Sequence, residues 1–461
     1  MNSQTIHNLL RPYEHLNVST NIIFYSLLNF KLMKYFSLFF LFISLLFLGC
    51  KEEKDQILPT ISVIEPNDNS IYNVLDFVRV RASISDNENL EEVFVQLEDL
   101  GSGRRVGKTI AFTPNSSSFE LDVLYEITDT LLNSGDYYFR IQAYDGENIN
   151  SAFASIRLIG IPRKQLGYYL LLDRTNDKAI YEVNDNNQSA FLFSAGQSEE
   201  IAFNSRAQML WYADKGSEKI GAYQVKKNQD FPPRYPNGNT VADPILDMQF
   251  VNGLTYVSTQ SGFVQAFNGN FSDVFTYKSS GNFKVDEIYP IANRIMLRET
   301  DGLGQNQRFL YLFSNGAIDS QSPSSEDVVG FGSRTSQSNS AFQFISQGSD
   351  MEVREYDLNS GLSSFLLQKP NFNFHSLIQI REYEYLFYND SRVVIYNLST
   401  NFTRTLANGL GSAVVAFDEV NEEVYVADGN NIILFDYNSG SQTGSFSAAF
   451  PVEDIVMRYN K

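Results

Sequence analysis

Cysteine is nearly absent from this sequence: Cys50 is the single one among 461 residues. One cysteine excludes an internal disulfide and a zinc site built from several thiolates. Histidine occurs three times, and His375 is the only one beyond the first 15 residues. Nucleophilic catalysis needs an activated serine or cysteine beside a base. No G-x-S-x-G, H-E-x-x-H or P-loop motif occurs either, so no catalytic signature is recognised.

Positive charge is also in short supply, with 35 Lys and Arg against 54 Asp and Glu and a net charge of −19. Such a surface repels nucleic acid, which argues against a nucleic-acid partner. What the sequence has in abundance is Phe (37) and Tyr (26), with many Gly, Asn and Ser. This mixture favours strands and turns over helices. The length exceeds that of one ordinary core, so we expect an all-β protein of at least two domains.

Cys50 ends an apolar segment that follows Met33 and Lys34. Residues 35–48 carry no charge, and a helix of about 14 residues spans about 21 Å, short of the roughly 30 Å hydrocarbon core of a membrane. A basic start, a short apolar stretch and a small residue are typical of a secretory signal peptide. We therefore predict a signal peptide over residues 33–49 and interpret residues 1–32 as the product of a mis-called start codon.

The segment Phe47-Leu48-Gly49-Cys50 resembles the lipobox of bacterial lipoproteins. That resemblance implies acylation of Cys50, cleavage before it and anchoring through several acyl chains. Lys51, Glu52 and Glu53 follow and resemble the export signal of surface lipoproteins of the Bacteroidetes type. This implies an outer-membrane lipoprotein facing the cell exterior, with residues 50–56 as a tether. The alternatives are a tilted transmembrane anchor, an unmodified thiol at Cys50, and a solvated tether with no export role.

Residues 57–160 read as about seven short alternating strands separated by polar turns, a pattern that predicts a two-sheet sandwich. The segment resembles bacterial immunoglobulin-like domains behind lipoprotein anchors, which implies a spacer. Asp86, Asp99 and Asp145 lie between its strands. They suggest either a calcium site of the cadherin kind or ordinary turn formers.

Residues 165–461 contain a repeat. Residues 414–440 read as three strands joined by polar turns, and the opening strand recurs with its last residue at Phe203, Phe250, Pro290, Phe331, Ile380, Phe417 and Met457. The interval averages about 42 residues, the period of a propeller blade. The first copy lacks an opening strand and the last opening strand lacks a repeat, so the C-terminal strand should complete the first blade. We predict an immunoglobulin-like β-sandwich followed by a seven-bladed β-propeller that this strand closes.

Residues 414–440 also resemble the propellers of the NHL and YVTN groups, which implies binding of proteins, glycans or small ligands. Acidic residues recur where the inner strands begin, at one expected rim of the ring. They suggest either a focused negative mouth for Ca²⁺ or a cationic ligand, or solvated loop charge. These residues are Glu199, Glu200, Asp247, Asp286, Glu287, Glu326, Asp327, Glu453 and Asp454.

The leading functional hypothesis is a lipid-anchored surface protein whose propeller binds a glycan, a peptide or a partner protein, with no cofactor other than a candidate Ca²⁺. Two alternatives stay open. One is a carbohydrate-active enzyme, a glycosidase or lyase that uses two rim carboxylates. The other is a periplasmic scaffold of outer-membrane assembly.

Overall fold

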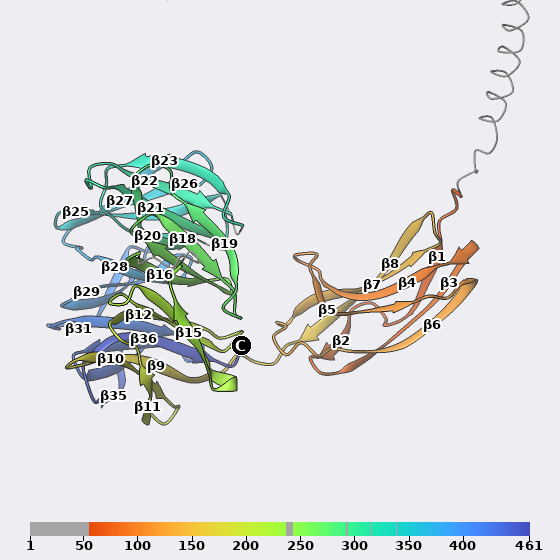
Figure 1. Ribbon diagram of the computed structural model, residues 1–461, viewed down its shortest axis with the longest axis horizontal. Helices are drawn as coiled ribbons and strands as arrows, with labels where there is room; N and C mark the ends of the chain where they lie inside the picture. Colours follow the sequence, from red (N-terminus) through yellow and green to blue (C-terminus); the bar gives the residue numbers. More distant parts are fainter. Residues whose placement is uncertain (1–54, 237–242, 292–293, 314, 338) are drawn as a thin grey trace, which may run out of the picture. The chain divides into compact units, whose positions relative to one another are not determined.

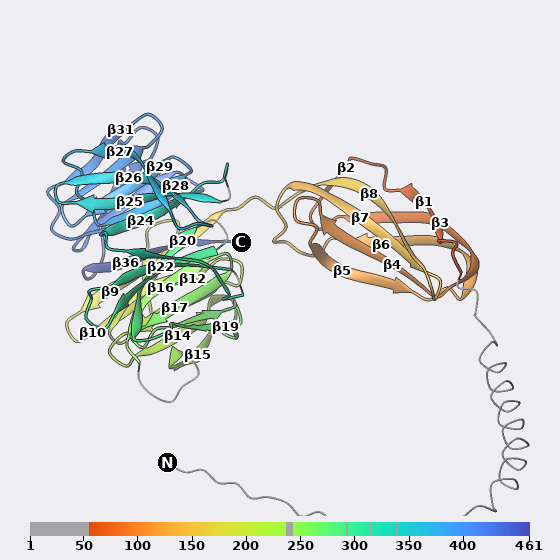
Figure 2. The ribbon, with the colours of Figure 1, turned by 90° about the horizontal axis from the view of Figure 1, so that it is seen from above.

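The computed structural model describes residues 55–236, 243–291, 294–313, 315–337 and 339–461. The chain forms two compact units, and the boundary between them in the sequence lies between Gly160 and Ile161. Both units are built from β-strands (Figures 1 and 2). Cys50, Lys51, Glu52 and Glu53 lie outside the described residues. Within them, no helix is long and apolar enough to cross a membrane.

The first unit contains two sheets (Figure 1). One has the order β1 (Thr60–Glu65), β3 (Phe77–Leu90), β6 (Ser116–Glu126). The other has the order β2 (Ser70–Asn73), β8 (Ile149–Ile159), β7 (Gly135–Tyr144), β4 (Glu92–Asp99), β5 (Arg105–Phe112).

Alternating apolar residues turn one face of each sheet of the first unit inward. Val78, Val80 and Ala82 of β3 are fully buried, as is Phe139 of β7. The ring of Tyr125 on β6 meets Phe139 edge-on, with centroids 5.1 Å apart. The two sheets therefore share one core, as the alternating sequence pattern predicts for a half-buried strand.

The second unit contains, among its described residues, seven antiparallel sheets of four strands each. In the first, β36 (Val452–Tyr459) lies beside β9 (Gln165–Arg174), followed by β10 (Asp177–Val183) and β11 (Ser189–Ser194). The other six take consecutive strands. They are β12 (Ser198–Asn204), β13 (Met209–Asp214), β14 (Lys219–Gln224) and β15 (Gln229–Arg234); β16 (Ile245–Val251), β17 (Leu254–Thr259), β18 (Phe263–Phe267) and β19 (Asp273–Lys278); β20 (Phe283–Ile291), β21 (Arg294–Asp301), β22 (Gln307–Leu312) and β23 (Ile318–Ser324); β24 (Val328–Ser333), β25 (Ser340–Gln347), β26 (Asp350–Asp357) and β27 (Ser363–Lys369); β28 (Ser376–Arg381), β29 (Glu384–Asn389), β30 (Arg392–Asn397) and β31 (Phe402–Asn408); and β32 (Ala413–Asp418), β33 (Glu423–Asp428), β34 (Asn431–Asp436) and β35 (Gln442–Ser447). A single turn of 3-10 helix, η1 (Val225–Lys227), follows β14.

The pairing expected for the C-terminal strand is present. β36 pairs antiparallel with β9, with Ile455 opposite Leu170 and Met457 opposite Tyr168 (Figure 1). β36 therefore takes the edge position beside β9 that the earliest strand takes in each of the other six sheets.

The first strands of the seven sheets, which we call the inner strands, contact one another in cyclic order. β12 contacts β16, and the contacts continue through β20, β24, β28 and β32. β36 contacts both β32 and β12, so the order returns to its start.

The hydrophobic clusters of the second unit lie between neighbouring sheets. Trp211 of β13, the only tryptophan, is fully buried against Phe267 and Phe271 of the next sheet. Tyr168 of β9 packs against Tyr425 of β33, with ring centroids 5.1 Å apart, which joins the first sheet to the last. Burial of apolar surface between sheets is what holds such repeats together, because one sheet alone cannot bury both its faces.

Candidate functional site

Five of the seven inner strands share an irregularity at one position. The register with the second strand shifts between Ser198 and Glu200 in β12, and the same shift precedes Asp247, Glu287, Gly330 and Asp454 in β16, β20, β24 and β36. A β-bulge adds a residue and re-aims the side chain beside it. In four of these five strands, the residue directly after the shift is a carboxylate.

Three of these carboxylates accept a hydrogen bond from the backbone of the next inner strand. Oδ2 of Asp454 lies 2.9 Å from the amide nitrogen of Ile201. Oε2 of Glu200 lies 2.9 Å from that of Met248, and Oδ2 of Asp247 lies 2.7 Å from that of Ile288. Inner strands of different sheets share no ladder, so these amides need another acceptor. The carboxylates thus link β36, β12, β16 and β20 in sequence.

The series of carboxylate–amide bonds ends at Glu287. Its Oε1 lies 2.6 Å from Nη2 of Arg298, the residue directly opposite in β21, and its other oxygen accepts from the hydroxyl of Tyr289. In the next inner strand Gly330 takes the equivalent position. A Cβ there would lie 2.8 Å from Cδ2 of Leu377, so the neighbouring leucine occupies the space a side chain would need.

The crowded carboxylates have raised pKa values. Burial raises the pKa of Asp454 to about 6. Burial, and then the charge of Asp247, raises the pKa of Glu200, which Lys215 partly offsets. Burial likewise raises the pKa of Asp247 and of Glu287. Enclosure of several like charges favours the neutral acids.

The remaining acids of the predicted rim have cations beside them. Glu199, next to Glu200, lies 2.7 Å from Lys215. The other ion pairs are Asp286–Lys284 (2.8 Å), Glu326–Arg354 (2.7 Å) and Glu453–Lys178 (2.9 Å). Asp327 interacts electrostatically with Arg298.

The rim is therefore a mixture of both charges. The acids were predicted from the sequence, whereas the cations Lys178, Lys215, Arg298 and Arg354 were not. Arg298 could have been predicted from the sequence, because pairing β20 with β21 as a hairpin places it directly opposite Glu287. The pairing of Lys178 could not have been predicted from a local pattern, because its partner Glu453 is 275 residues away.

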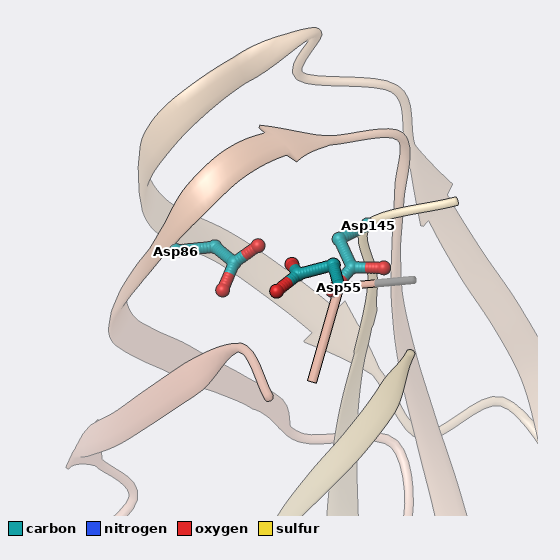
Figure 3. Close-up of side chains that lie close together, drawn as sticks. All are labelled: Asp55, Asp86 and Asp145. Carbon is teal, nitrogen blue, oxygen red and sulfur yellow. The ribbon is translucent and has the colours of Figure 1, made fainter. Parts of the chain in front are cut away.

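A second group of acids lies in the first unit (Figure 3). Asp55 precedes β1, Asp86 lies in β3, and Asp145 follows β7. Carboxylate oxygens from all three lie within 4.8 Å of one another, and this is the one such acidic group in the described part of the chain. A cavity of about 420 Å³ adjoins it, lined by Asp55, Glu88, Asn89, Glu91, Asp145, Gly146 and Glu147.

Of the three aspartates suggested as a calcium site from the sequence, the structure brings together Asp86 and Asp145 and excludes Asp99. Asp99 pairs with Tyr137 near the start of β7, whereas Asp145 follows the end of that strand. Oδ1 of Asp99 instead accepts hydrogen bonds from the amide and the hydroxyl of Ser102, both at 2.7 Å. Asp99 is thus a turn former, and the third member of the group is Asp55.

No protein-family model and no curated protein matches the sequence. Among solved structures, the chain is similar to dihydro-heme d1 dehydrogenase NirN (12% identity, TM-score 0.45, covering 62% of this chain and 65% of that one). It is also similar to a quinonprotein alcohol dehydrogenase-like protein from Bacteroides thetaiotaomicron (10% identity, TM-score 0.44, covering 87% and 99%). A third similarity is to the computationally designed Ika8 protein (11% identity, TM-score 0.43, covering 65% and 98%).

At these identities and TM-scores, the similarities carry no argument about function. The fold rests on the strand pairings of the chain itself: an all-β protein whose second unit is a β-propeller-like array of four-stranded sheets.

Proposed function

We propose that this chain is a lipid-anchored cell-surface binding protein. In this proposal the first unit is an immunoglobulin-like sandwich that serves as a spacer, and the second is a seven-bladed β-propeller that binds a glycan, a peptide or a partner protein. The cyclic order of contacts among seven inner strands supports a closed ring of seven blades. Two packed sheets in about 100 residues support the sandwich.

The convergence of charged side chains from several sheets carries the binding proposal. Glu200 interacts electrostatically with Asp247, Asp454 and Lys215. Asp247 also interacts electrostatically with Glu287, and Arg298 does so with Asp327. Tyr388 of β29 interacts in the same way with Asp454. Together these groups come from six of the seven sheets.

Carboxylates, cations and tyrosine hydroxyls that converge in this way offer both donors and acceptors to one ligand. Such a set suits a neutral polar molecule better than a simple cation, because Lys215, Arg298 and Arg354 already lie beside the acids. A glycan or a polar peptide segment fits this chemistry.

Binding is tested with the detergent-solubilised full-length protein on glycan and peptide arrays. The variant Glu199→Gln removes an exposed rim carboxylate that is paired with Lys215, and Asp122→Asn in the first unit is its matched control, since Asp122 pairs with Arg79 at similar exposure. We expect E199Q to weaken binding of a hit and D122N to leave it unchanged. Equal binding by both variants and the wild type contradicts a ligand site at this rim.

The lipid anchor is tested separately. Cys50→Ser should abolish labelling with a fatty-acid probe and release the protein from membranes, because acyl chains supply the membrane affinity. A wild-type protein that stays unlabelled yet fractionates with membranes contradicts the anchor. Protease treatment of intact cells then separates the surface location from a periplasmic one, which also tests the assembly-scaffold alternative.

A carbohydrate-active enzyme is the second candidate, favoured by the raised pKa of Glu200 beside Asp247. Glycosidases use two carboxyl groups whose pKa values are pushed apart. Here both oxygens of Asp247 accept hydrogen bonds from the protein, which favours a structural role. Product release from any glycan hit, lost in Glu200→Gln, would establish catalysis instead of binding.

A further inference from the structure

The three aspartates of the first unit come from segments that are far apart in the sequence. Asp86 belongs to the three-stranded sheet, and Asp145 follows a strand of the five-stranded sheet. Asp55 lies in the segment that leads into β1. Figure 3 shows the carboxylates of Asp86 and Asp55 directed toward each other, with Asp145 beside Asp55. The group thus lies where the leading segment meets the ends of both sheets.

One oxygen of this group is buried without a partner. Oδ1 of Asp86 is inaccessible to solvent and makes no hydrogen bond, whereas its Oδ2 accepts from the amide of Glu88 at 3.2 Å. A buried polar atom without a partner is costly, and a charged one more so. This oxygen therefore indicates a ligand that the polypeptide does not supply.

Asp55 and Asp145 accept hydrogen bonds from nearby amide groups, but among the described residues no lysine or arginine forms an ion pair with the group. In the described part of the first unit, the arginines that form ion pairs do so with other acids: Arg79 with Asp122, Arg81 with Glu65 and Arg140 with Glu98. Asp145 is only 8% exposed, and the adjoining cavity adds the carboxylates of Glu88, Glu91 and Glu147. This distinguishes the group from the rim of the second unit, where cations lie beside the acids.

We propose that Asp55, Asp86 and Asp145 bind one Ca²⁺ ion. Ca²⁺ takes six to eight oxygen ligands at about 2.4 Å, so two oxygens on one ion lie at most about 4.8 Å apart. The three carboxylates already meet that limit. The cavity has room for water and further carboxylates to complete the shell. Oxygen-only ligands disfavour Zn²⁺, which prefers sulfur and nitrogen, and Mg²⁺ demands a stricter octahedron.

The ion would fasten the leading segment to the sandwich. At present Asp55 is held by hydrogen bonds: its amide donates to Oε2 of Glu147 at 2.6 Å, and its carbonyl oxygen accepts from the side chain of Asn148 at 3.1 Å. Ca²⁺ shared by Asp55, Asp86 and Asp145 adds a crosslink between this segment and both sheets.

Calorimetric titration of the detergent-solubilised full-length protein with CaCl₂, at fixed ionic strength, tests the site. Asp86→Asn is the main variant and Asp99→Asn the matched control, since Asp99 is a turn aspartate of the same unit. We expect one high-affinity Ca²⁺ in the wild type and in D99N, and an affinity at least tenfold lower in D86N. Because D86N removes a like charge, it should be at least as stable as the wild type without Ca²⁺.

A second readout is the melting midpoint of the first unit, which Ca²⁺ should raise in the wild type and D99N but not in D86N. Three outcomes overturn the proposal: no Ca²⁺ uptake by the wild type at millimolar concentration, equal uptake by D86N, or equal affinity for Mg²⁺. If D86N fails to fold by circular dichroism, Asp55→Asn replaces it, because Asp55 precedes the first strand.

Discussion

Asp454, in the strand β36, accepts a hydrogen bond from the backbone amide of Ile201 at 2.9 Å. Asp454 belongs to β36, and Ile201 belongs to β12, the next inner strand in the cyclic order of contacts. The bond therefore joins β36 to a sheet other than the one to which β36 belongs, and other than the β32–β35 sheet that precedes β36 in the sequence. It is the first of three such bonds between inner strands.

Replacing Asp454 with Ala should destabilise the second unit by about 1–3 kcal/mol, because the enclosed amide of Ile201 loses its acceptor. Asp454→Asn keeps a carbonyl oxygen and should cost less. Denaturant unfolding of both variants measures the difference. Equal stability of D454A and D454N would show that the amide finds another partner.

The pH dependence of the second unit should follow the raised pKa of Asp454. Its pKa is about 6 in the folded protein, against about 3.9 in an unfolded chain. The folded state then holds the proton more tightly, so this group favours folding increasingly as the pH falls from about 6 toward 4. Glu200, Asp247 and Glu287 shift in the same direction.

Calorimetry between pH 4.5 and 8 checks this. Acids of the first unit with lowered pKa values, such as Asp68 and Asp99, act in the opposite direction. Because their effect begins only near the unfolded pKa of about 3.9, the first unit should respond little between pH 5 and 7.5, whereas the second unit should melt higher at pH 5 than at pH 7.5. D454N should flatten its slope. A second unit that loses stability steadily below pH 6 contradicts the assignment.

Deletion of residues 451–461 should abolish cooperative unfolding of the second unit. The loss removes the partner of β9 and breaks the inner-strand contacts with β12 and β32. Exposed strand edges also promote aggregation. Calorimetry should still detect a transition of the first unit. A truncated protein with both transitions intact would contradict closure by β36.

Gly330→Ala tests why the carboxylate series is interrupted in β24. A Cβ at this position would lie 2.8 Å from Leu377, so we expect a loss of about 1–3 kcal/mol from overpacking. The second substitution Leu377→Val should restore part of the loss. If G330A alone is neutral in chemical denaturation, steric exclusion by Leu377 is not the reason.

The strands of the second unit were largely predictable because turn residues and buried aromatics recur with the blade period. The acids at the inner strands were also visible, but their contacts were not. Whether Glu200 or Glu199 turns to the next strand depends on the register shift after Ser198, and a bulge has no reliable signature in one sequence. Glu200 bonds a backbone amide, whereas Glu199 pairs with Lys215.

The aspartate group shows the same limit in the first unit. For Asp99 the sequence left calcium binding and turn formation open, and the structure shows a turn former. Antiparallel pairing of β4 with β7 separates Asp99 from Asp145 by the length of a strand. Asp55 was missed because it lies outside any regular element and meets Glu147 across 92 residues. Local patterns identify strands, but contacts of that range depend on how the sheets pack.

The position of β36 has a consequence for biosynthesis. A ribosome makes β9 about 280 residues before it makes the strand that pairs with it. Until β36 emerges, one edge of β9 has no partner, and the amide of Ile201 lacks the carboxylate of Asp454. Sheets in the middle of the second unit can form as they are translated. The sheet begun first is completed last, so completion of this unit waits for the synthesis of β36.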